Sequence, residues 1–329
     1  MTAAVSSPLY VPLAHTRRLL SVRDALHVTE EVFAMHARGE ITMCEPPRFT
    51  IHGRTQPIYS HVKGCVLESI PILGVRIVAY VVNPDGSGTS APQSTRLVLL
   101  TDPRTGVLLA MVDEHWNYSI RTTAAAVVGA KHLARPNTRV VAIVGAGNLA
   151  RTGLLALRET FPLTVVRVSS RRPESAVRFA AEMSGEIGLV VERCDTVREA
   201  CEGADLIFVA TTAGTPLVMR DWVAPGACVV TVGSDEIDHR LYGSADKVVA
   251  DEVDDVAALL RPVVQAGLMP EGGIYGAIWE VVAGCKPGRE RPEERIVIKT
   301  VGLVSQDVAV AHHVYRKAVG AGLGFPLAI

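Results

Sequence analysis

One stretch constrains the fold more than any other: an apolar run over residues 140–144 that stops at Gly145 and Gly147 and continues into helix-forming residues. This G-x-G-x-x-A pattern predicts a strand, a tight turn and a helix start, where a dinucleotide pyrophosphate lies on exposed backbone amides. Gly145 would make the turn, Gly147 would permit the close approach, and Ala150 is the small third residue. Because glycine pairs also follow apolar runs in turns that bind nothing, the flanking sequence has to decide.

The residues that follow continue as a dinucleotide-binding fold requires. A helix is predicted over residues 148–160 and a strand over residues 164–168. Strands are also predicted near residues 139–144, 188–192, 205–210, 227–232, 246–250 and 295–299, with helices starting at Pro173, Thr196 and Glu252. Such alternation of strands and helices is the signature of a doubly wound parallel sheet.

The first hundred residues have a different texture. A capping-box-like Ser21–Asp24 pattern opens an amphipathic helix that Gly39 stops. Short segments near residues 48–51, 75–82 and 95–100 then read as strands separated by turns, so this region is predicted to be α+β. An alanine-rich helix over 121–134 should link it to the parallel sheet, and a last helix over 304–319 should return to it.

Composition and charge limit the classes of partner that the protein is expected to bind. With 33 basic and 34 acidic residues, a net charge of −1 gives no electrostatic footprint for nucleic acid or an anionic membrane, so a small-molecule substrate is expected. The six cysteines form no C-x-x-C pair and have no histidine at ligand spacing, which favours reduced thiols and no metal site. The sequence shows no secretory signal pattern and no membrane-spanning apolar run, so a cytoplasmic protein is expected.

The residues after the second predicted strand bear on the cofactor. An acidic residue there takes the ribose hydroxyls of NAD, whereas arginine accommodates the extra phosphate of NADP. This chain has Ser170, Arg171 and Arg172 at that point and no carboxylate. Since a guanidinium donates two parallel bonds to a phosphate, NADP(H) is predicted, with NAD(H) as the alternative cofactor. The competing interpretation is that both arginines are solvated charges ahead of the helix that Pro173 begins.

Five blocks in order resemble the ornithine cyclodeaminase/mu-crystallin family: residues 21–26, 121–126, 145–147, 232–235, and 299–302 followed by Asp307. The resemblance implies a Rossmann domain over residues 121–302, inserted into an α+β substrate and dimerisation domain over residues 1–120 and 303–329. It also implies a homodimer. The family's shared chemistry is hydride transfer between a nicotinamide and the α-carbon of an amine or imine next to a carboxylate.

Arginines are the expected substrate ligands. Arg48 and Arg121 match the family's carboxylate-binding arginines, and an arginine beside apolar elements must find an anion because a buried unpaired charge is costly. The alternative for each is an ion pair with a protein carboxylate. Thr95 resembles a substrate-side threonine of the family.

At Arg76 the family usually carries lysine. Arginine stays charged, so Arg76 suits anion binding better than proton shuttling, although it occupies a catalytic position. Three arginines around one pocket would suit a substrate with a second carboxylate. Lys63 is considered as a replacement amine, with a surface position as the favoured interpretation.

Asp235 follows an apolar strand, where a doubly wound sheet places catalytic loops. The resemblance implies that it is the acid/base at the substrate nitrogen, or the carboxylate that holds an iminium. An Asx turn at Ser234-Asp235 is the structural alternative. Adjacent His312 and His313 do not share a helix face and so do not form a metal pair. His115 and Trp116 are placed in a loop before Arg121.

The cofactor-binding residues are predicted at the glycine loop, the second strand and the carboxyl ends of later strands: Thr122, Gly145, Ala146, Gly147, Asn148, Leu149, Ser170, Arg171, Arg172, Thr211, Thr212, Val232, Gly233, Ser234, Thr300 and Gly302. With Asp235 and the arginines, they point to an NADP(H)-dependent imino-acid (ketimine) reductase or amino-acid dehydrogenase. Two alternatives stay open, an ornithine/lysine cyclodeaminase and a mu-crystallin-like NADPH-dependent binding protein.

Overall fold

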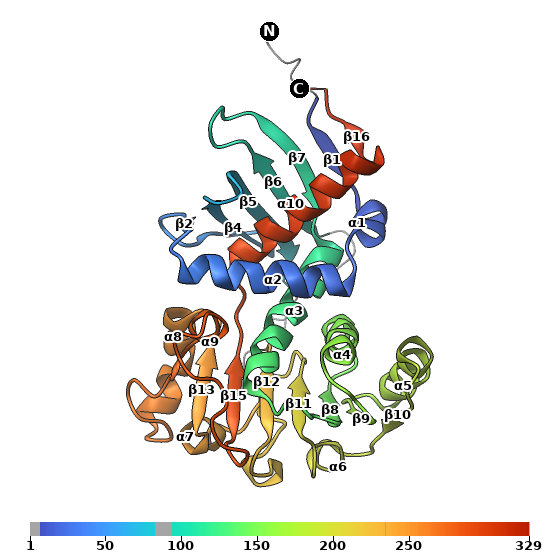
Figure 1. The fold of residues 1–329 in the computed structure, drawn as a ribbon, viewed down its shortest axis with the longest axis vertical. Helices are drawn as coiled ribbons and strands as arrows, with labels where there is room; N and C mark the ends of the chain where they lie inside the picture. Colours follow the sequence, from blue (N-terminus) through green and yellow to red (C-terminus); the bar gives the residue numbers. More distant parts are fainter. Residues whose placement is uncertain (1–6, 83–93, 234, 329) are drawn as a thin grey trace. The chain divides into compact units, whose positions relative to one another are not determined.

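The computed structural model describes residues 7–82, 94–233 and 235–328. The chain divides into two compact units, each with its own sheet (Figure 1). Unit 1 comprises Met1–Arg121 and Leu303–Ile329, and unit 2 comprises Thr122–Gly302. Helix α3 (His115–Leu133) contains the boundary between them.

Unit 2 is built on a parallel sheet with the strand order β10-β9-β8-β11-β12-β15-β13-β14. Every pairing in this sheet is parallel, and the strand order reverses direction beside β8, which confirms the predicted doubly wound Rossmann architecture. The strands are β8 (Val140–Val144), β9 (Val165–Ser169), β10 (Val191–Arg193), β11 (Leu206–Val209), β12 (Cys228–Thr231), β13 (Lys247–Ala250), β14 (Gly276–Ala277) and β15 (Ile296–Lys299).

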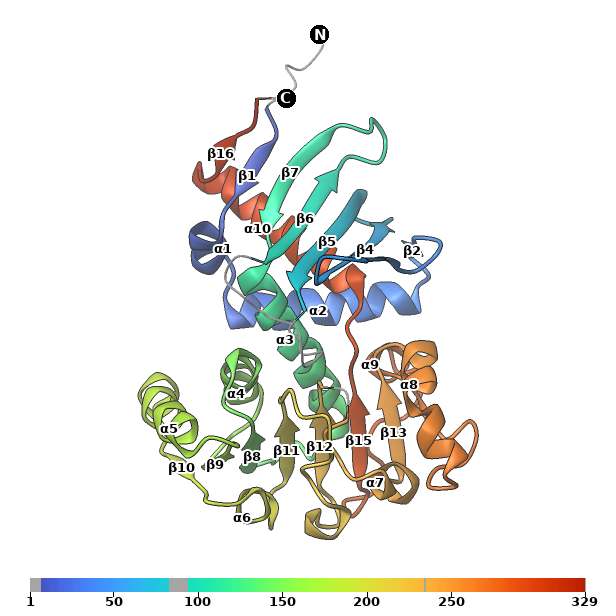
Figure 2. The ribbon, with the colours of Figure 1, turned by 180° about the vertical axis from the view of Figure 1, so that it is seen from behind.

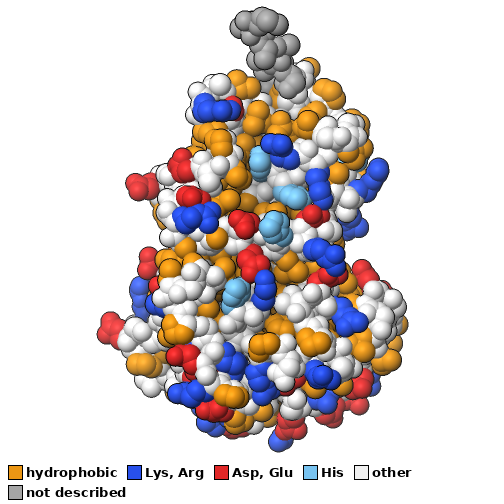
Figure 3. Space-filling view, in the orientation of Figure 1, with side chains coloured by type: hydrophobic (Ala, Val, Ile, Leu, Met, Phe, Trp, Pro, Cys, Tyr) orange, Lys and Arg blue, Asp and Glu red, His pale blue; other side chains and the backbone are white. Residues whose placement is uncertain are grey.

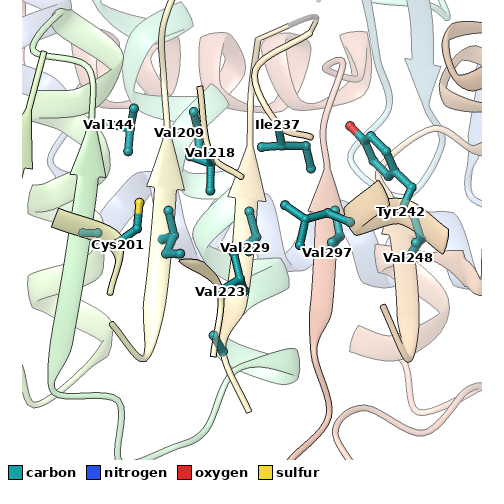
Figure 4. Close-up of a cluster of buried hydrophobic side chains, with 14 of the residues drawn as sticks. Val144, Cys201, Val209, Val218, Val223, Val229, Ile237, Tyr242, Val248 and Val297 are labelled. Atoms are coloured by element: carbon teal, nitrogen blue, oxygen red, sulfur yellow. The ribbon is translucent and has the colours of Figure 1, made fainter. Parts of the chain in front are cut away.

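Apolar side chains on both faces of this sheet form the core of unit 2, as parallel sheets require. Figure 4 shows part of one such cluster, in which Val209, Val229 and Val297 from neighbouring strands pack with Ile237 and Tyr242. The helices of the unit, besides α3, are α4 (Asn148–Thr160), α5 (Pro173–Ile187), α6 (Val197–Cys201), the 3-10 turn η1 (Arg220–Trp222), α7 (Arg240–Ser244), α8 (Val253–Gln265) and α9 (Ile278–Val282).

Unit 1 contains a mainly antiparallel sheet with the order β16-β1-β7-β6-β5-β4-β2, in which β3 also pairs with β4 and β1 runs parallel to β7. Its strands are β1 (Leu9–Val11), β2 (Ile41–Met43), β3 (Phe49–His52), β4 (Ile58–Leu67), β5 (Ile72–Val81), β6 (Thr95–Thr101), β7 (Leu108–Asp113) and β16 (Phe325–Pro326). The N-terminal region therefore contains the predicted mixture of helices and strands.

Helices cover one face of this sheet. Helix α2 (Val22–Ala37) begins with the predicted capping box between Ser21 and Asp24, and α10 (Val304–Ala321) packs against α2 and against β4 to β7. Contact is so close that a Cβ added to Gly74 would lie 2.4 Å from a methyl of Val308. The absence of a side chain at Gly74 thus allows α10 to pack closely against β5. Helix α1 (Leu13–Leu19) completes the unit.

The opposite face of the unit 1 sheet is seen in Figure 2, where β5 to β7 lie in front of α10. Half-buried and buried residues alternate along β5, and the half-buried aliphatic ones are Leu73, Val75 and Ile77. On β6, Leu97 and Leu99 are also half-buried. This face therefore presents a row of partly exposed aliphatic side chains.

Two local predictions were wrong. Helix α3 begins at His115 rather than at Arg121, so His115 and Trp116 belong to its first turn instead of a loop. Asp113 starts this turn, because its carboxylate accepts a 3.0 Å hydrogen bond from the His115 backbone N–H. Strand β4 was not predicted, because its polar residues interrupt the apolar pattern.

Acidic and basic side chains are interspersed on the face drawn in Figure 3, in keeping with the near-zero net charge. Within the part of the chain that the structure describes, no helix has the length and apolar character needed to span a membrane.

Candidate active site

The glycine loop between β8 and α4 has the geometry that an anion requires. Gly145 has a φ of 110°, and a Cβ there would lie 2.3 Å from the carbonyl oxygen of Ala210, so only glycine fits. Gly147 is the N-cap of α4 and supplies no side chain to the first amides, and a Cβ placed on it would meet no described atom within 4 Å. Backbone N–H groups at this helix start are accessible to a pyrophosphate. The loop fits a dinucleotide.

The residues after β9 lie at the surface. Ser170 Oγ donates a 2.8 Å hydrogen bond to the carbonyl oxygen of Arg172, which closes the turn ahead of α5. Arg171 and Arg172 are both exposed, and Arg172 is the N-cap residue of α5. Exposed guanidinium groups at this point match either a bound phosphate or solvated charges, so the cofactor preference remains a prediction.

A buried carboxylate that the sequence analysis missed organises the carboxyl ends of β11 and β12. Glu236 is only 1% exposed and accepts hydrogen bonds from Thr231 Oγ1 at 2.7 Å and from the Gly233 N–H at 2.5 Å. Its other oxygen accepts from the Thr211 N–H. Glu236 thereby holds two of the predicted cofactor residues, Thr211 and Gly233, in one arrangement. The sequence signal that could have indicated this role was a second acidic residue next to Asp235, just after a glycine turn.

Asp251, at the end of β13, organises the loop after β15 in the same way. Its oxygens accept from the N–H groups of Val301 at 2.9 Å and Gly302 at 2.7 Å. Lys299 is fully buried and donates to the carbonyl oxygen of Gly233. Burial lowers the pKa of Lys299, although nearby carboxylates, Glu236 first, oppose the shift.

Among the hydroxyls of unit 2 that are buried without a hydrogen-bond partner in the described parts of the chain are those of Thr122 and Thr300. Buried unpaired hydroxyls are costly, so each is suited to a ligand oxygen. Both belong to the predicted cofactor set. Among the other predicted cofactor residues, Thr212 is exposed, Val232 and Gly233 are half-buried, and Ser234 lies outside the described residues.

Asp235 keeps an accessible carboxylate. Its side chain is 41% exposed, and its Oδ1 lies 2.7 Å from Nε2 of His239, four residues later. This pair provides a carboxylate and an imidazole that can hold or move a proton at neighbouring atoms. The Asx-turn alternative involves Ser234 and so falls outside the described residues.

Unit 1 holds a buried cluster of two arginines and two carboxylates. Arg76 of β5 donates from Nε to Glu114 Oε1 at 2.5 Å, and the same nitrogen lies 3.5 Å from Asp307 Oδ2 on α10. Arg121 of α3 donates from Nε to Asp307 Oδ1 at 2.5 Å. All four side chains are at most 6% exposed. The protein carboxylate that was the alternative partner for Arg121 is therefore present, and Arg76 has a carboxylate partner as well.

The pKa values of the two carboxylates of this cluster are shifted in opposite directions. Burial, together with the charge of Asp307, raises the pKa of Glu114 to about 8 despite Arg76. For Asp307 the guanidinium groups of Arg121 and Arg76 outweigh burial and hold its pKa below the ordinary value. The cluster thus favours the protonated form of Glu114 and the ionised form of Asp307.

Hydrogen-bonding capacity in the cluster is also unused. Arg121 Nη1 is buried and has no hydrogen-bond partner within the described parts of the chain. Tyr118 lies among three guanidinium groups, with its ring centroid 4.5 Å from Arg96, 5.3 Å from Arg121 and 5.7 Å from Arg76. A carboxylate bound at Arg121 would satisfy the orphaned donor.

The other predicted substrate residues are not members of this cluster. Arg48 is exposed immediately before β3, and Thr95 is exposed at the start of β6. Thr95 lies three residues from Val98, which pairs with Arg76, so strand alternation puts Thr95 on the opposite face of the sheet. Lys63 is half-buried on β4, directly opposite Arg76 in the ladder.

The chain combines a doubly wound sheet, an open glycine loop and a buried arginine–carboxylate cluster. These features define an NAD(P)-dependent oxidoreductase. The chain belongs to the ornithine cyclodeaminase/mu-crystallin family, whose model matches residues 11–322. The predicted resemblance is confirmed.

Relatives of known name cover nearly the whole chain. An alanine dehydrogenase of Archaeoglobus fulgidus is 30% identical over 318 residues, which are 93% of this chain and 94% of that protein. The Δ1-pyrroline-2-carboxylate reductase of Thermococcus litoralis, solved in complex with NADH and L-proline, is 29% identical with a TM-score of 0.88 over 97% of this chain and 100% of its own. The iminosuccinate reductase of Paracoccus denitrificans, solved with NAD+, is 26% identical with a TM-score of 0.88, covering 98% and 100%.

Proposed function

We propose that the protein is an NADP(H)-dependent reductase of α-imino acids, working in reverse as an amino-acid dehydrogenase. The observation that carries this proposal is the buried cluster in which Arg121 binds Asp307 through Nε and keeps an Nη1 without a partner among the described residues. Such a guanidinium donor suits a substrate carboxylate. The named relatives act on substrates of this class.

In the proposed mechanism the nicotinamide supplies or accepts the hydride at the substrate α-carbon. Arg121 binds the α-carboxylate through the guanidinium edge that Asp307 leaves free, and Asp307 fixes the plane of that guanidinium. Asp235 gives a proton to the substrate nitrogen during reduction and accepts one during oxidation, with His239 Nε2 holding the carboxylate between steps.

NADP(H) is the proposed cofactor rather than NAD(H). The support is local: exposed Arg171 and Arg172 follow β9 where an NAD-specific site carries a carboxylate. The two solved relatives named above hold NADH or NAD+, so the proposal of NADP(H) depends on these two arginines alone.

A dicarboxylic imine is the proposed substrate class. Burial first, and then the charges of Arg76, Lys63, Arg48 and Arg96, lower the pKa of His61 on β4 to about 4. These cations would attract a second carboxylate of the substrate. The Paracoccus relative is named for a dicarboxylic imine.

We also propose a homodimer that covers the open face of the unit 1 sheet. The half-buried aliphatic residues of β5 and β6 on that face would lose their remaining exposure against a second copy (Figure 2). An archaeal alanine dehydrogenase of 28% identity and TM-score 0.89 was solved as a dimer. Sedimentation equilibrium of the full chain tests this assembly, and a monomer at micromolar concentration contradicts it.

The activity test uses NADPH absorbance with ammonia and a panel of keto acids, run beside the reverse reaction with amino acids and NADP+. Net NADPH consumption matched by amino-acid formation supports the reductase. Proline formed from ornithine without net consumption indicates a cyclodeaminase, and tight NADPH binding with no turnover of any substrate indicates a binding protein. Either of the last two results overturns the proposal.

A further inference from the structure

His61 on β4 is held by the buried cluster but belongs to none of the functions described above. Its Nε2 lies 2.9 Å from Arg76 Nη1. An arginine nitrogen can only donate, so Nε2 of His61 must be the acceptor of this hydrogen bond. The ring proton of the neutral imidazole is therefore on Nδ1.

Arg76 is itself fixed, which makes the His61 tautomer a structural property. Glu114 and Asp307 hold the Arg76 guanidinium through Nε, and Tyr118 lies against it. Protonation of His61 would put a donor against a donor. Burial and the surrounding cations also lower the pKa of this imidazole to about 4, so it stays neutral at physiological pH.

The consequence is a buried donor without an acceptor. His61 Nδ1 is buried and has no hydrogen-bond partner among the residues that the structure describes. The charged groups that act on this ring are all cations: Arg76 of β5, Lys63 of β4, Arg48 before β3 and Arg96 of β6. The ring of Tyr59 lies beside it, 5.6 Å between centroids. An orphaned N–H in a positive field calls for an anionic oxygen.

We propose that His61 is a specificity-determining residue, whose Nδ1–H donates a hydrogen bond to the second carboxylate of a dicarboxylic substrate. Arg76 and Glu114 act as positioning residues that lock the imidazole in the donating tautomer. This inference rests on the proposed imino-acid reductase function and deepens it, because it assigns the distal carboxylate to a named donor.

The kinetic test compares His61→Leu with His61→Asn, in which the asparagine amide can replace the donor at the Nδ1 position. Substrates are the imines formed with ammonia from oxaloacetate and from pyruvate. The ratio of KM for the oxaloacetate imine to KM for the pyruvate imine should rise about tenfold or more in His61→Leu, the loss expected for a hydrogen bond to a charged group. It should largely recover in His61→Asn. His52→Leu, on exposed β3, is the matched control.

A nitrogen-15 NMR titration gives a readout that does not need turnover. In the wild-type protein at pH 7, the His61 ring should show a protonated Nδ1 and an unprotonated Nε2, and L-aspartate added with NADP+ should shift Nδ1 while L-alanine should not. An active wild type with an unchanged KM ratio in His61→Leu, or a protonated Nε2, overturns the inference. Absence of any turnover with an aspartate-induced Nδ1 shift would instead reject the reductase function and retain the His61 site.

Discussion

Buried polar groups are used differently in the two units. In unit 2, Glu236 and Asp251 accept hydrogen bonds mainly from backbone N–H groups, and each fixes a loop at the carboxyl end of the sheet. In unit 1, the carboxylates bind arginine side chains, and Arg121 Nη1 and His61 Nδ1 have no partner among the described residues. The carboxylates of unit 2 thus shape loops, whereas the cluster of unit 1 holds nitrogen donors that a ligand can use.

This contrast follows from what each unit is proposed to bind. A dinucleotide is recognised largely by backbone groups, so carboxylates such as Glu236 serve to shape loops. A small anionic substrate is recognised by side chains, and a buried arginine with an unused donor can bind it. Asp235 differs from Glu236 and Asp251, because its carboxylate is accessible and pairs with an imidazole side chain.

Asp235→Asn should have the largest effect. If the accessible carboxylate moves the proton at the substrate nitrogen, turnover should fall about 1,000-fold, within the range for a lost general acid–base, while the Kd for NADPH changes little. Steady-state kinetics and fluorescence titration of NADPH measure the two quantities. Asp221→Asn, at an exposed aspartate of η1, is the control. A comparable loss in NADPH affinity would make Asp235 a loop-shaping residue like Glu236.

Arg121→Lys tests the open donor of unit 1. Lysine preserves the charge beside Asp307 but not the planar fork, so kcat/KM for the imine should fall about 100-fold with the fold intact. The matched control is Arg104→Lys, an exposed arginine that pairs with Asp102. Equal kcat/KM in the wild type and Arg121→Lys would show that the cluster is structural, and the contrast between the units would then disappear.

Arg171→Ala combined with Arg172→Ala separates phosphate binding from solvated charge. Loss of charge-assisted bonds to the 2′-phosphate should raise the KM for NADPH about tenfold and leave the KM for NADH unchanged. Arg178→Ala, exposed on α5, is the control. A wild-type enzyme that already prefers NADH would refute the NADP(H) assignment.

Glu114→Gln should produce the smallest effect, a change in how stability depends on pH. The folded-state pKa of Glu114, about 8, lies above the ordinary value, so its contribution to stability is complete at acid pH and is lost as pH rises through 8. Thermal melts between pH 6 and 9 should show a smaller decline in Tm for Glu114→Gln than for the wild type. Glu31→Gln, on the exposed side of α2, should follow the wild type. Parallel curves for all three proteins would show that Glu114 is ionised.

Much of unit 2 could be predicted from local sequence. Apolar runs of Val and Ile, ended by glycine or proline, define buried parallel strands, and the predicted helix over residues 148–160 has the bounds of α4. Its glycine loop depends on residues that are adjacent in the chain. Such signals can be recognised without knowledge of tertiary contacts.

The charged cluster of unit 1 could not be predicted in the same way, because its members come from distant segments. Arg76 meets Glu114 and Asp307 only when β5, the start of α3 and α10 are packed together. The sequence showed that buried arginines need anions but not which carboxylates supply them. Likewise, the proton position on His61 follows from a contact between β4 and β5 that no spacing rule reveals.

The most direct measurement of the central claim follows the hydride itself. The full-length protein is incubated with NADPH carrying deuterium at C4 of the nicotinamide, ammonia and oxaloacetate or pyruvate, and the amino-acid product is analysed by mass spectrometry. Hydride transfer to an imino acid predicts one deuterium at the α-carbon for each NADPH oxidised. Amino acid formed without deuterium, or NADPH oxidised without an amino-acid product, would contradict it.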